Sequence, residues 1–265
     1  GIVNGSGPSG AGGFTSEATG RRLGHDRQAL LPRIVAPEEL LCHEEAYTDL
    51  NFDRAGVSPN NLGGLGPDAG REGMLFTGVS TFEGQEVDLL VNASASYTPG
   101  KVERNGKGSL VGRININSTG PVQLTFALLK SGTQDPMTLP KVFFTLFDVS
   151  ARGAGGDDLE IVAEGVSEYF VSEQTLVAVR TNGSRCIFGP TEDPPAPLDP
   201  SKAGVKDMRL DSVNRSVLLV YRNTSEFALD VKARPGPAGR DFEFAGWSEA
   251  AEIGKRAVCA GGEGH

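Results

Sequence analysis

The hexapeptide Val142–Phe147, VFFTLF, is apolar on both sides of an extended chain. Successive side chains of a strand point to opposite faces. Phe143 and Phe147 would lie on one face, and Phe144 and Leu146 on the other. The pattern predicts a central strand that is covered on both sides.

Shorter strand patterns recur from Tyr47 to about Trp247. Their spacing of roughly 8–12 residues is typical of sandwiches and barrels, and turn residues such as Asn105-Gly106 separate them. The sequence therefore predicts an all-β fold: a two-sheet antiparallel sandwich, jelly-roll-like, with an extended N-terminal arm and short flanking helices. The predicted strands are Leu50–Phe52, Met74–Val79, Glu86–Ser94, Leu110–Asn117, Val122–Leu129, Val142–Val149, Leu159–Ala163, Tyr169–Val171, Thr175–Arg180, Cys186–Phe188, Ser216–Arg222, Phe227–Val231 and Phe242–Ala245.

The chain of 265 residues divides into three parts by composition. Residues 1–46 are predicted to form an arm, which is Gly-rich over residues 1–24 and carries an apolar patch of Leu30, Leu31, Ile34 and Val35. Residues 47–248 are the predicted sandwich, and residues 249–265 a C-terminal tail. Short helices are predicted at Pro37–Leu41 and Ser248–Cys259.

Net charge and hydropathy argue against nucleic-acid binding and against a membrane-spanning segment. The net charge is −9, and the 25 basic residues are scattered, so nucleic-acid binding is not expected. The longest apolar runs, such as Ser216–Tyr221, fall far short of the ~20 residues of a membrane span.

N-glycosylation sequons are the strongest motif signal. Random placement of the chain's 11 Asn among its Ser and Thr would give about 1.4 sequons. As a set, the excess favours a secreted glycoprotein with covalent glycans. The six acceptors are Asn4, Asn92, Asn117, Asn182, Asn214 and Asn223.

The strand patterns place these acceptors on the surface. In residues 113–118, Ile114 and Ile116 would be buried, with Asn115 and Asn117 facing outward. In residues 87–92, the apolar face leaves Asn92 on the opposite side. Asn182-Gly183 and Asn223-Thr224 are predicted turns after strands.

Three cysteines leave the disulfide pattern open. A Cys42–Cys259 bond would close the two flanks of the sandwich, with Cys186 free. Cys186 is the alternative partner, because sequence spacing does not fix connectivity.

Catalytic motifs do not emerge, and we expect no enzyme. The three histidines lie at the flanks, and no Gly-x-Ser-x-Gly turn or zinc spacing occurs. Glu86 and Asp88 resemble the start of a paired-carboxylate glycosidase strand, but the third acid is replaced by Val91. We interpret both as solvated strand acids.

A weak calcium signal lies around the Gly153–Gly156 loop. Calcium takes six to eight oxygen ligands, and acidic loops can supply them. No dedicated spacing is present, so a solvated acidic turn is the favoured interpretation and no cofactor is expected. The candidate ligands are Asp148, Asp157, Asp158 and Glu160.

Three stretches resemble a secreted β-sandwich module of algae and other microbial eukaryotes: Leu50–Asp53, Asn60–Asp68 and Arg240–Ser248. The Asn60–Asp68 stretch is the most specific. Some glycosylated extracellular fibrils are stacks of such jelly-roll protomers joined by a donated terminal segment. The resemblance implies no catalytic residues and covers about Tyr47–Ser248.

The leading hypothesis is a structural protomer of an extracellular, N-glycosylated filament or cell coat. Ordering a Gly-rich arm is costly, and docking on a neighbouring copy would offset that cost. An arm folded back on its own domain is the alternative arrangement. The alternative function is a secreted, lectin-like carbohydrate-binding module, with or without calcium.

Overall fold

The computed structural model describes residues 49–246, except 109, 150–158, 173 and 192–210. Several predicted features lie outside the described residues. These are the N-terminal arm with Leu30, Leu31, Ile34 and Val35, both predicted helices, Asn4, Cys42, Cys259, Asp157 and Asp158.

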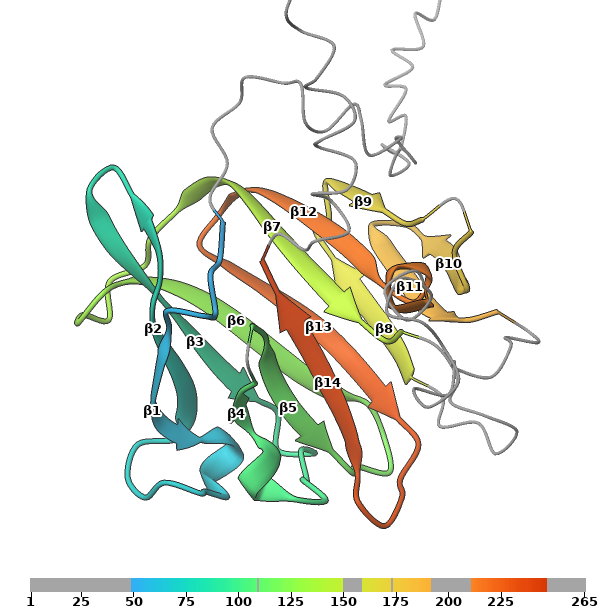
Figure 1. The fold of residues 1–265 in the computed structure, drawn as a ribbon, viewed down its shortest axis with the longest axis horizontal. Coiled ribbons are helices and arrows are strands. Elements are labelled where there is room, and N and C mark those ends of the chain that lie inside the picture. Colours follow the sequence, from blue (N-terminus) through green and yellow to red (C-terminus); the bar gives the residue numbers. More distant parts are fainter. Residues whose placement is uncertain (1–48, 109, 150–158, 173, 192–210, 247–265) are drawn as a thin grey trace, which may run out of the picture.

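Two antiparallel sheets form a sandwich (Figure 1). The eight-stranded sheet has the order β1-β2-β3-β6-β13-β8-β11-β10, and the six-stranded sheet has the order β4-β5-β14-β7-β12-β9. The strands of the first sheet are β1 (Gly56–Asn61), β2 (Gly73–Phe82), β3 (Gln85–Ala93), β6 (Val122–Lys130), β13 (Glu226–Ala233), β8 (Leu159–Glu164), β11 (Arg185–Pro190) and β10 (Val177–Asn182). Those of the second are β4 (Gly106–Lys107), β5 (Gly112–Ile116), β14 (Arg240–Ala245), β7 (Leu139–Phe147), β12 (Val217–Thr224) and β9 (Glu168–Phe170). Two short 3-10 helices, η1 (Leu62–Gly64) and η2 (Val102–Arg104), accompany the strands, and residues 211–214 are α-helical.

The predicted all-β sandwich is confirmed, with three differences in its strands. Leu50–Phe52 is not a strand: both side chains are buried as anchors, and the chain turns at Asp53, where Asn51 Oδ1 accepts the Asp53 N–H at 2.9 Å. β1 and β4 were not predicted. β1 contains Gly and Pro and lies at a sheet edge, where Pro is tolerated.

The core lies between the inner faces of the two sheets. Phe126 of β6 contacts Phe144 of β7 and Phe244 of β14, with ring centroids 4.9 and 5.4 Å apart. Phe52 extends this aromatic cluster, since its ring lies 5.4 Å from that of Phe244. The aromatic side chains therefore join both sheets to the segment that enters the sandwich.

β7 is buried on both faces, as its sequence predicts. It lies between β14 and β12, and Phe144 and Leu146 face the core. On the opposite face, Phe143 and Thr145 are each only 1% exposed. β7 therefore also places buried side chains on the outer face of the six-stranded sheet.

No helix among the described residues is long and apolar enough to cross a membrane.

Candidate functional site

The predicted glycosylation acceptors are dispersed over the sandwich. Asn182 ends β10 at the tight hairpin to β11, where Gly183 has a φ of 63°. Asn223 lies near the end of β12 with a φ of 48°, close to the connection that crosses from the six-stranded sheet to β13 of the eight-stranded sheet. Both side chains are exposed. Exposed positions at strand ends give an attached sugar free access to solvent.

Asn92 faces outward from the middle of the eight-stranded sheet. Its neighbours Val91 and Leu89 alternate inward and are fully buried, as predicted. Asn92 is half-buried and lies opposite Thr125 of β6. This acceptor is therefore on the predicted face but is partly enclosed by neighbouring strands.

Asn117 and Asn214 are half-buried, and their amide oxygens take part in local hydrogen bonds. Asn117 Oδ1 accepts the Gly236 N–H at 2.8 Å. Asn214 Oδ1 accepts the Ser172 hydroxyl at 2.6 Å. A glycan would be attached at Nδ2 and would leave these oxygen contacts intact, but the half-buried side chains give it less open space than Asn182 and Asn223 do.

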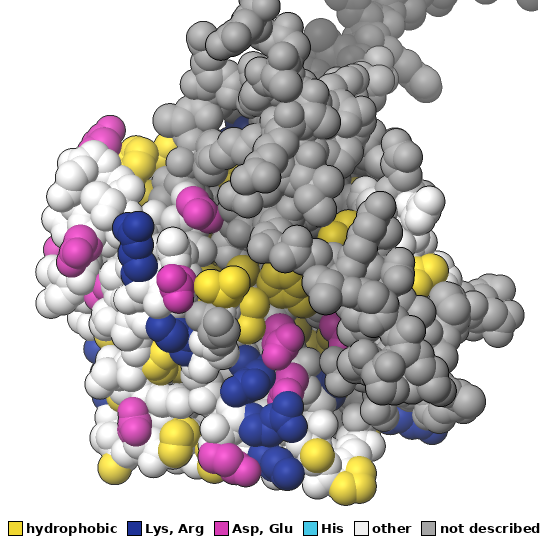
Figure 2. Space-filling model, in the orientation of Figure 1, with side chains coloured by type: hydrophobic (Ala, Val, Ile, Leu, Met, Phe, Trp, Pro, Cys, Tyr) yellow, Lys and Arg dark blue, Asp and Glu magenta, His cyan; other side chains and the backbone are white. Residues whose placement is uncertain are grey.

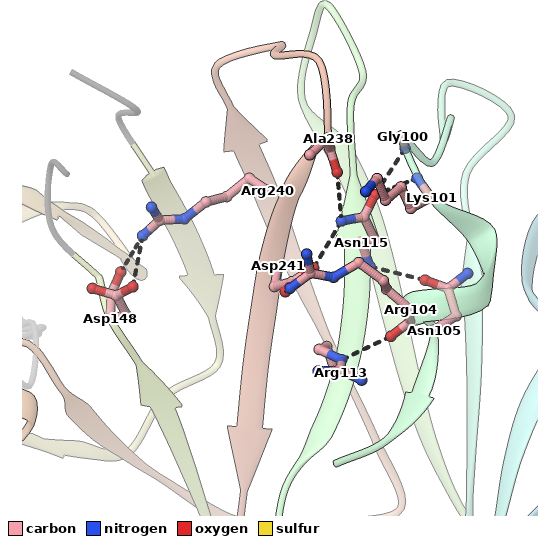
Figure 3. A network of polar contacts seen from close by, with 10 residues as sticks. All are labelled: Gly100, Lys101, Arg104, Asn105, Arg113, Asn115, Asp148, Ala238, Arg240 and Asp241. Carbon is pink, nitrogen blue, oxygen red and sulfur yellow. Dashed lines mark hydrogen bonds and ion pairs between the residues drawn. The ribbon is translucent and has the colours of Figure 1, made fainter. Parts of the chain in front are cut away.

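Asn115 was predicted to face solvent, and the structure shows that this is wrong. Its side chain is fully buried in a polar network (Figure 3). Asn115 Oδ1 accepts the N–H groups of Gly100 and Lys101, each at 2.8 Å. Asn115 Nδ2 donates to Asp241 Oδ1 at 2.7 Å and to the Ala238 carbonyl at 3.1 Å. The outer face of β5 is covered here by the loops 98–105 and 236–239, which the strand pattern alone did not reveal.

Close packing of these loops depends on glycine. Gly239 has a φ of +65°, and a Cβ at this position would come within 2.5 Å of Asn115 Oδ1. A Cβ on Gly100 would come within 2.5 Å of the Gly239 nitrogen. Each position therefore admits only glycine without a shift of the backbone.

Tyr97 and Asn105 continue the network into the core. Asn105 Nδ2 donates to the Tyr97 hydroxyl at 2.8 Å, and that hydroxyl donates to the Asn115 carbonyl at 3.1 Å. Burial raises the pKa of Tyr97 to about 12, partly offset by the hydrogen bond from Asn105. The phenol is therefore a neutral structural group.

Charged side chains surround the network with both signs interspersed. Arg104 pairs with Asp241, and Arg113 lies opposite Glu243 in the β5–β14 register. Figure 2 shows Lys and Arg side chains next to Asp and Glu over this part of the face. Such alternation differs from the single-sign patch of a nucleic-acid site.

The two calcium candidates that the structure describes each contact a guanidinium. Asp148 Oδ2 lies 3.2 Å from Arg240 Nη2, and Glu160 Oε2 lies 2.9 Å from Arg180 Nη2. Asp148 follows β7 of one sheet, whereas Glu160 belongs to β8 of the other. Among the described residues, no group of three or more His, Cys, Asp or Glu could hold a metal ion.

Asp88 is a buried structural acid, and its prediction as a solvated side chain is wrong. Only 2% of it is exposed. A register shift in β2 turns the Gly78 N–H toward Asp88 Oδ1 at 2.8 Å, and the Gly132 N–H reaches Asp88 Oδ2 at 3.2 Å. Glu86 is exposed, as predicted. The carboxylate of Asp88 thus holds a bulge and a turn together.

Cys186 of β11 is a buried thiol without a disulfide in the described part of the chain. Burial raises its pKa, which keeps the sulfur protonated and weakly nucleophilic. Because Cys42 and Cys259 lie outside the described residues, the choice between a free Cys186 and Cys186 as an alternative partner stays open. The Cys42–Cys259 pair stays a prediction.

The comparisons with known proteins add little beyond the fold. No protein-family model matches the sequence, and no curated protein matches it. Among solved structures, the chain is similar to the N-terminal domain of the Streptococcus gordonii adhesin Sgo0707, with 12% identity and a TM-score of 0.42. The match covers 65% of this chain and 47% of that one, so the chain spans under half the length of the adhesin domain's chain. A likeness at this level carries no argument about function.

Proposed function

We propose that this chain is a secreted, N-glycosylated structural protomer, which assembles with copies of itself into an extracellular filament or cell coat. The observation that carries the proposal is the placement of Asn182 and Asn223 as exposed side chains near the ends of strands, together with the excess of sequons. Glycans at these positions would lie beside the connections between strands. They would not disturb the packing between the sheets.

A structural role is also favoured by the way the described polar groups are used. Asn115, Asp88 and Tyr97 hold loops and bulges to the sheets, and each is nearly inaccessible to solvent. Asp148 and Glu160 are paired with arginines. Buried, satisfied groups of this kind stabilise one arrangement of the chain. They favour a scaffold over the calcium-dependent, lectin-like alternative.

Glycan mapping tests the secreted-glycoprotein part of the proposal. The chain would be expressed through a eukaryotic secretory pathway, and peptide masses would be compared before and after enzymatic deglycosylation. We expect the highest occupancy at Asn182 and Asn223. We expect lower occupancy at Asn117 and Asn214, because both side chains are half-buried.

The control is an Asn182→Gln/Asn223→Gln double variant. It should lose the glycan mass of those two sites while it remains folded and secreted. An unchanged mass of the original protein after deglycosylation would overturn the proposal.

A further inference from the structure

The outer face of the six-stranded sheet carries a second hydrophobic cluster. It consists of Phe143 of β7, Phe170 of β9, and Leu218 and Val220 of β12. Leu218 lies opposite Phe170 and Val220 lies opposite Phe143 in the strand registers. We call these four residues the outer cluster. It is separate from the main core, which contains the intervening Phe144 and Leu219.

The outer cluster is buried although it faces away from the eight-stranded sheet. Its four side chains are between 0% and 7% exposed. None of the strands that the structure describes lies over this face, because the only other sheet packs on the opposite one. A soluble protein does not leave a contiguous aromatic and aliphatic surface bare without a partner. Lys141 of β7 covers part of the cluster, with its Nζ 5.4 Å from the centroid of the Phe143 ring. The described strands supply no second layer over the rest of this face.

Both ends of the described chain meet at the edge of this face. A Cβ on Gly246 would come within 2.4 Å of the Leu50 carbonyl oxygen, so the entering and leaving segments lie against each other. The hydroxyl of Thr145 donates to the Gly246 carbonyl at 2.6 Å, and Thr145 lies opposite Leu218 of the outer cluster. The chain before Asp49 thus begins next to the cluster.

The lengths and compositions of the two terminal segments indicate which of them docks on the outer cluster. An extended chain covers about 3.5 Å per residue, so the stretch from Val35 to Asp49 reaches up to roughly 50 Å. Crossing from β14 to β9 spans three strand spacings, about 15 Å. The C-terminal residues leave from the same corner, but residues 247–265 carry only three large apolar side chains, Trp247, Ile253 and Val258, and these are widely spaced. Residues 29–35 are denser in such side chains.

We propose that residues 29–35 dock on the outer cluster through Leu30, Leu31, Ile34 and Val35. The inference rests on the proposed self-assembly, for which the sequence predicts residues 1–46 as the docking arm, and it names the surface that receives the arm. Pro32 lacks an N–H and interrupts any continuous strand ladder. The contact is therefore side-chain packing across the face of β7, β12 and β9.

Photo-cross-linking in the full-length chain tests this surface. Leu31 is replaced by photoreactive benzoylphenylalanine, and the cross-linked peptides are mapped by mass spectrometry. We expect the products to lie in β7, β9 and β12, with a yield severalfold above that from the same group at Phe14 of the Gly-rich segment. Leu218→Arg should reduce the yield severalfold, whereas Leu90→Arg on the eight-stranded sheet should leave it unchanged.

Mixing an isotope-labelled copy with an unlabelled one distinguishes two claims: that residues 29–35 dock on the outer cluster, and that they do so on a neighbouring copy. Cross-links on the outer cluster between labelled and unlabelled chains would support both this inference and assembly through the arm. Cross-links on the cluster within one chain only would support the inference and overturn the donated-arm assembly. Products that lie mainly outside β7, β9 and β12 would overturn the inference.

Discussion

At the scale of single residues, one side chain joins three segments of the chain. Asn115 links β5 to the loop at Gly100 and Lys101 and to the segment from Ala238 to Asp241. An amide is well suited to this position, because its oxygen accepts two N–H groups while its nitrogen donates twice. Removing it leaves several buried groups without partners.

We expect Asn115→Ala to lower the free energy of unfolding by roughly 2–4 kcal/mol, because buried donors and acceptors lose their hydrogen bonds. Urea denaturation of the unglycosylated protein measures the change. Asn182→Ala is the matched control at an exposed turn, and it should change stability by less than about 0.5 kcal/mol. Equal effects of the two substitutions would contradict the network's structural role.

Tyr97 gives the protein an alkaline pH dependence. Its pKa is raised to about 12 in the folded state, against an ordinary value of about 10 in the unfolded chain. Above pH 10 the unfolded state releases this proton first, so the stabilisation is complete below pH 10 and is lost as the pH rises toward 12. The raised pKa of Tyr221, also caused by burial, adds a second alkaline loss.

Comparison of the original protein with Tyr97→Phe isolates the contribution of Tyr97 to the alkaline loss of stability. Between pH 9 and pH 11.5 we expect the stability of the original protein to fall more steeply, by up to roughly 2 kcal/mol, since Tyr221 is common to both. Parallel stability profiles would contradict the assignment.

At the scale of elements, the corner where the chain enters and leaves the sandwich depends on a close backbone contact. Gly246 follows β14 and lies against Leu50, and the Gly246 N–H donates to the Leu50 carbonyl at 3.2 Å. A Cβ there would come within 2.5 Å of the Leu50 nitrogen. The Gly246 carbonyl also accepts a hydrogen bond from the Thr145 hydroxyl of β7.

Gly246→Ala is therefore expected to destabilise the fold by roughly 1–3 kcal/mol, because backbone atoms must shift to admit the methyl group. Thermal unfolding measures this effect. Gly120→Ala is the matched control, because a Cβ at Gly120 meets nothing within 4 Å. A loss of stability at Gly120 equal to that at Gly246 would show that the corner contact is not the cause.

Most strands could be predicted from the sequence, because alternation reports which side of a strand is buried. The pattern of β7 even predicted two covered faces. Alternation failed where an outward residue is covered by something other than a sheet. Asn115 is covered by two loops, and Asp88 is reached by the N–H groups of a bulge and a turn.

Short or polar strands at the sheet edges also could not be predicted from hydrophobic alternation. β1 has little apolar periodicity, and β4 has only two residues. The turn after Asn182 could be predicted, because Asn-Gly ends a strand. The turn predicted at Asn223-Thr224 is wrong, because β12 continues to Thr224. The half-buried state of Asn117 and Asn214 could not be predicted from the sequence. Their hydrogen-bond partners, Gly236 and Ser172, are distant in sequence.

At the scale of the whole molecule, the proposed assembly joins the N-terminal arm of one copy to the sandwich of the next. An interface that runs from the arm of one copy to the sandwich of the next does not close on itself unless the rotation forms a ring. Repetition of such a contact therefore builds a filament. The four aliphatic side chains of residues 29–35 would supply the apolar surface of the contact.

Sedimentation velocity and electron microscopy of the full-length glycosylated chain test this claim most directly. The original protein is compared with Leu30→Asp/Leu31→Asp/Ile34→Asp, and with Phe14→Asp as the control in the arm. We predict extended assemblies from the original protein and from the control, and folded single protomers from the triple variant. Monomers from the original protein, or unchanged filaments from the triple variant, would contradict the account.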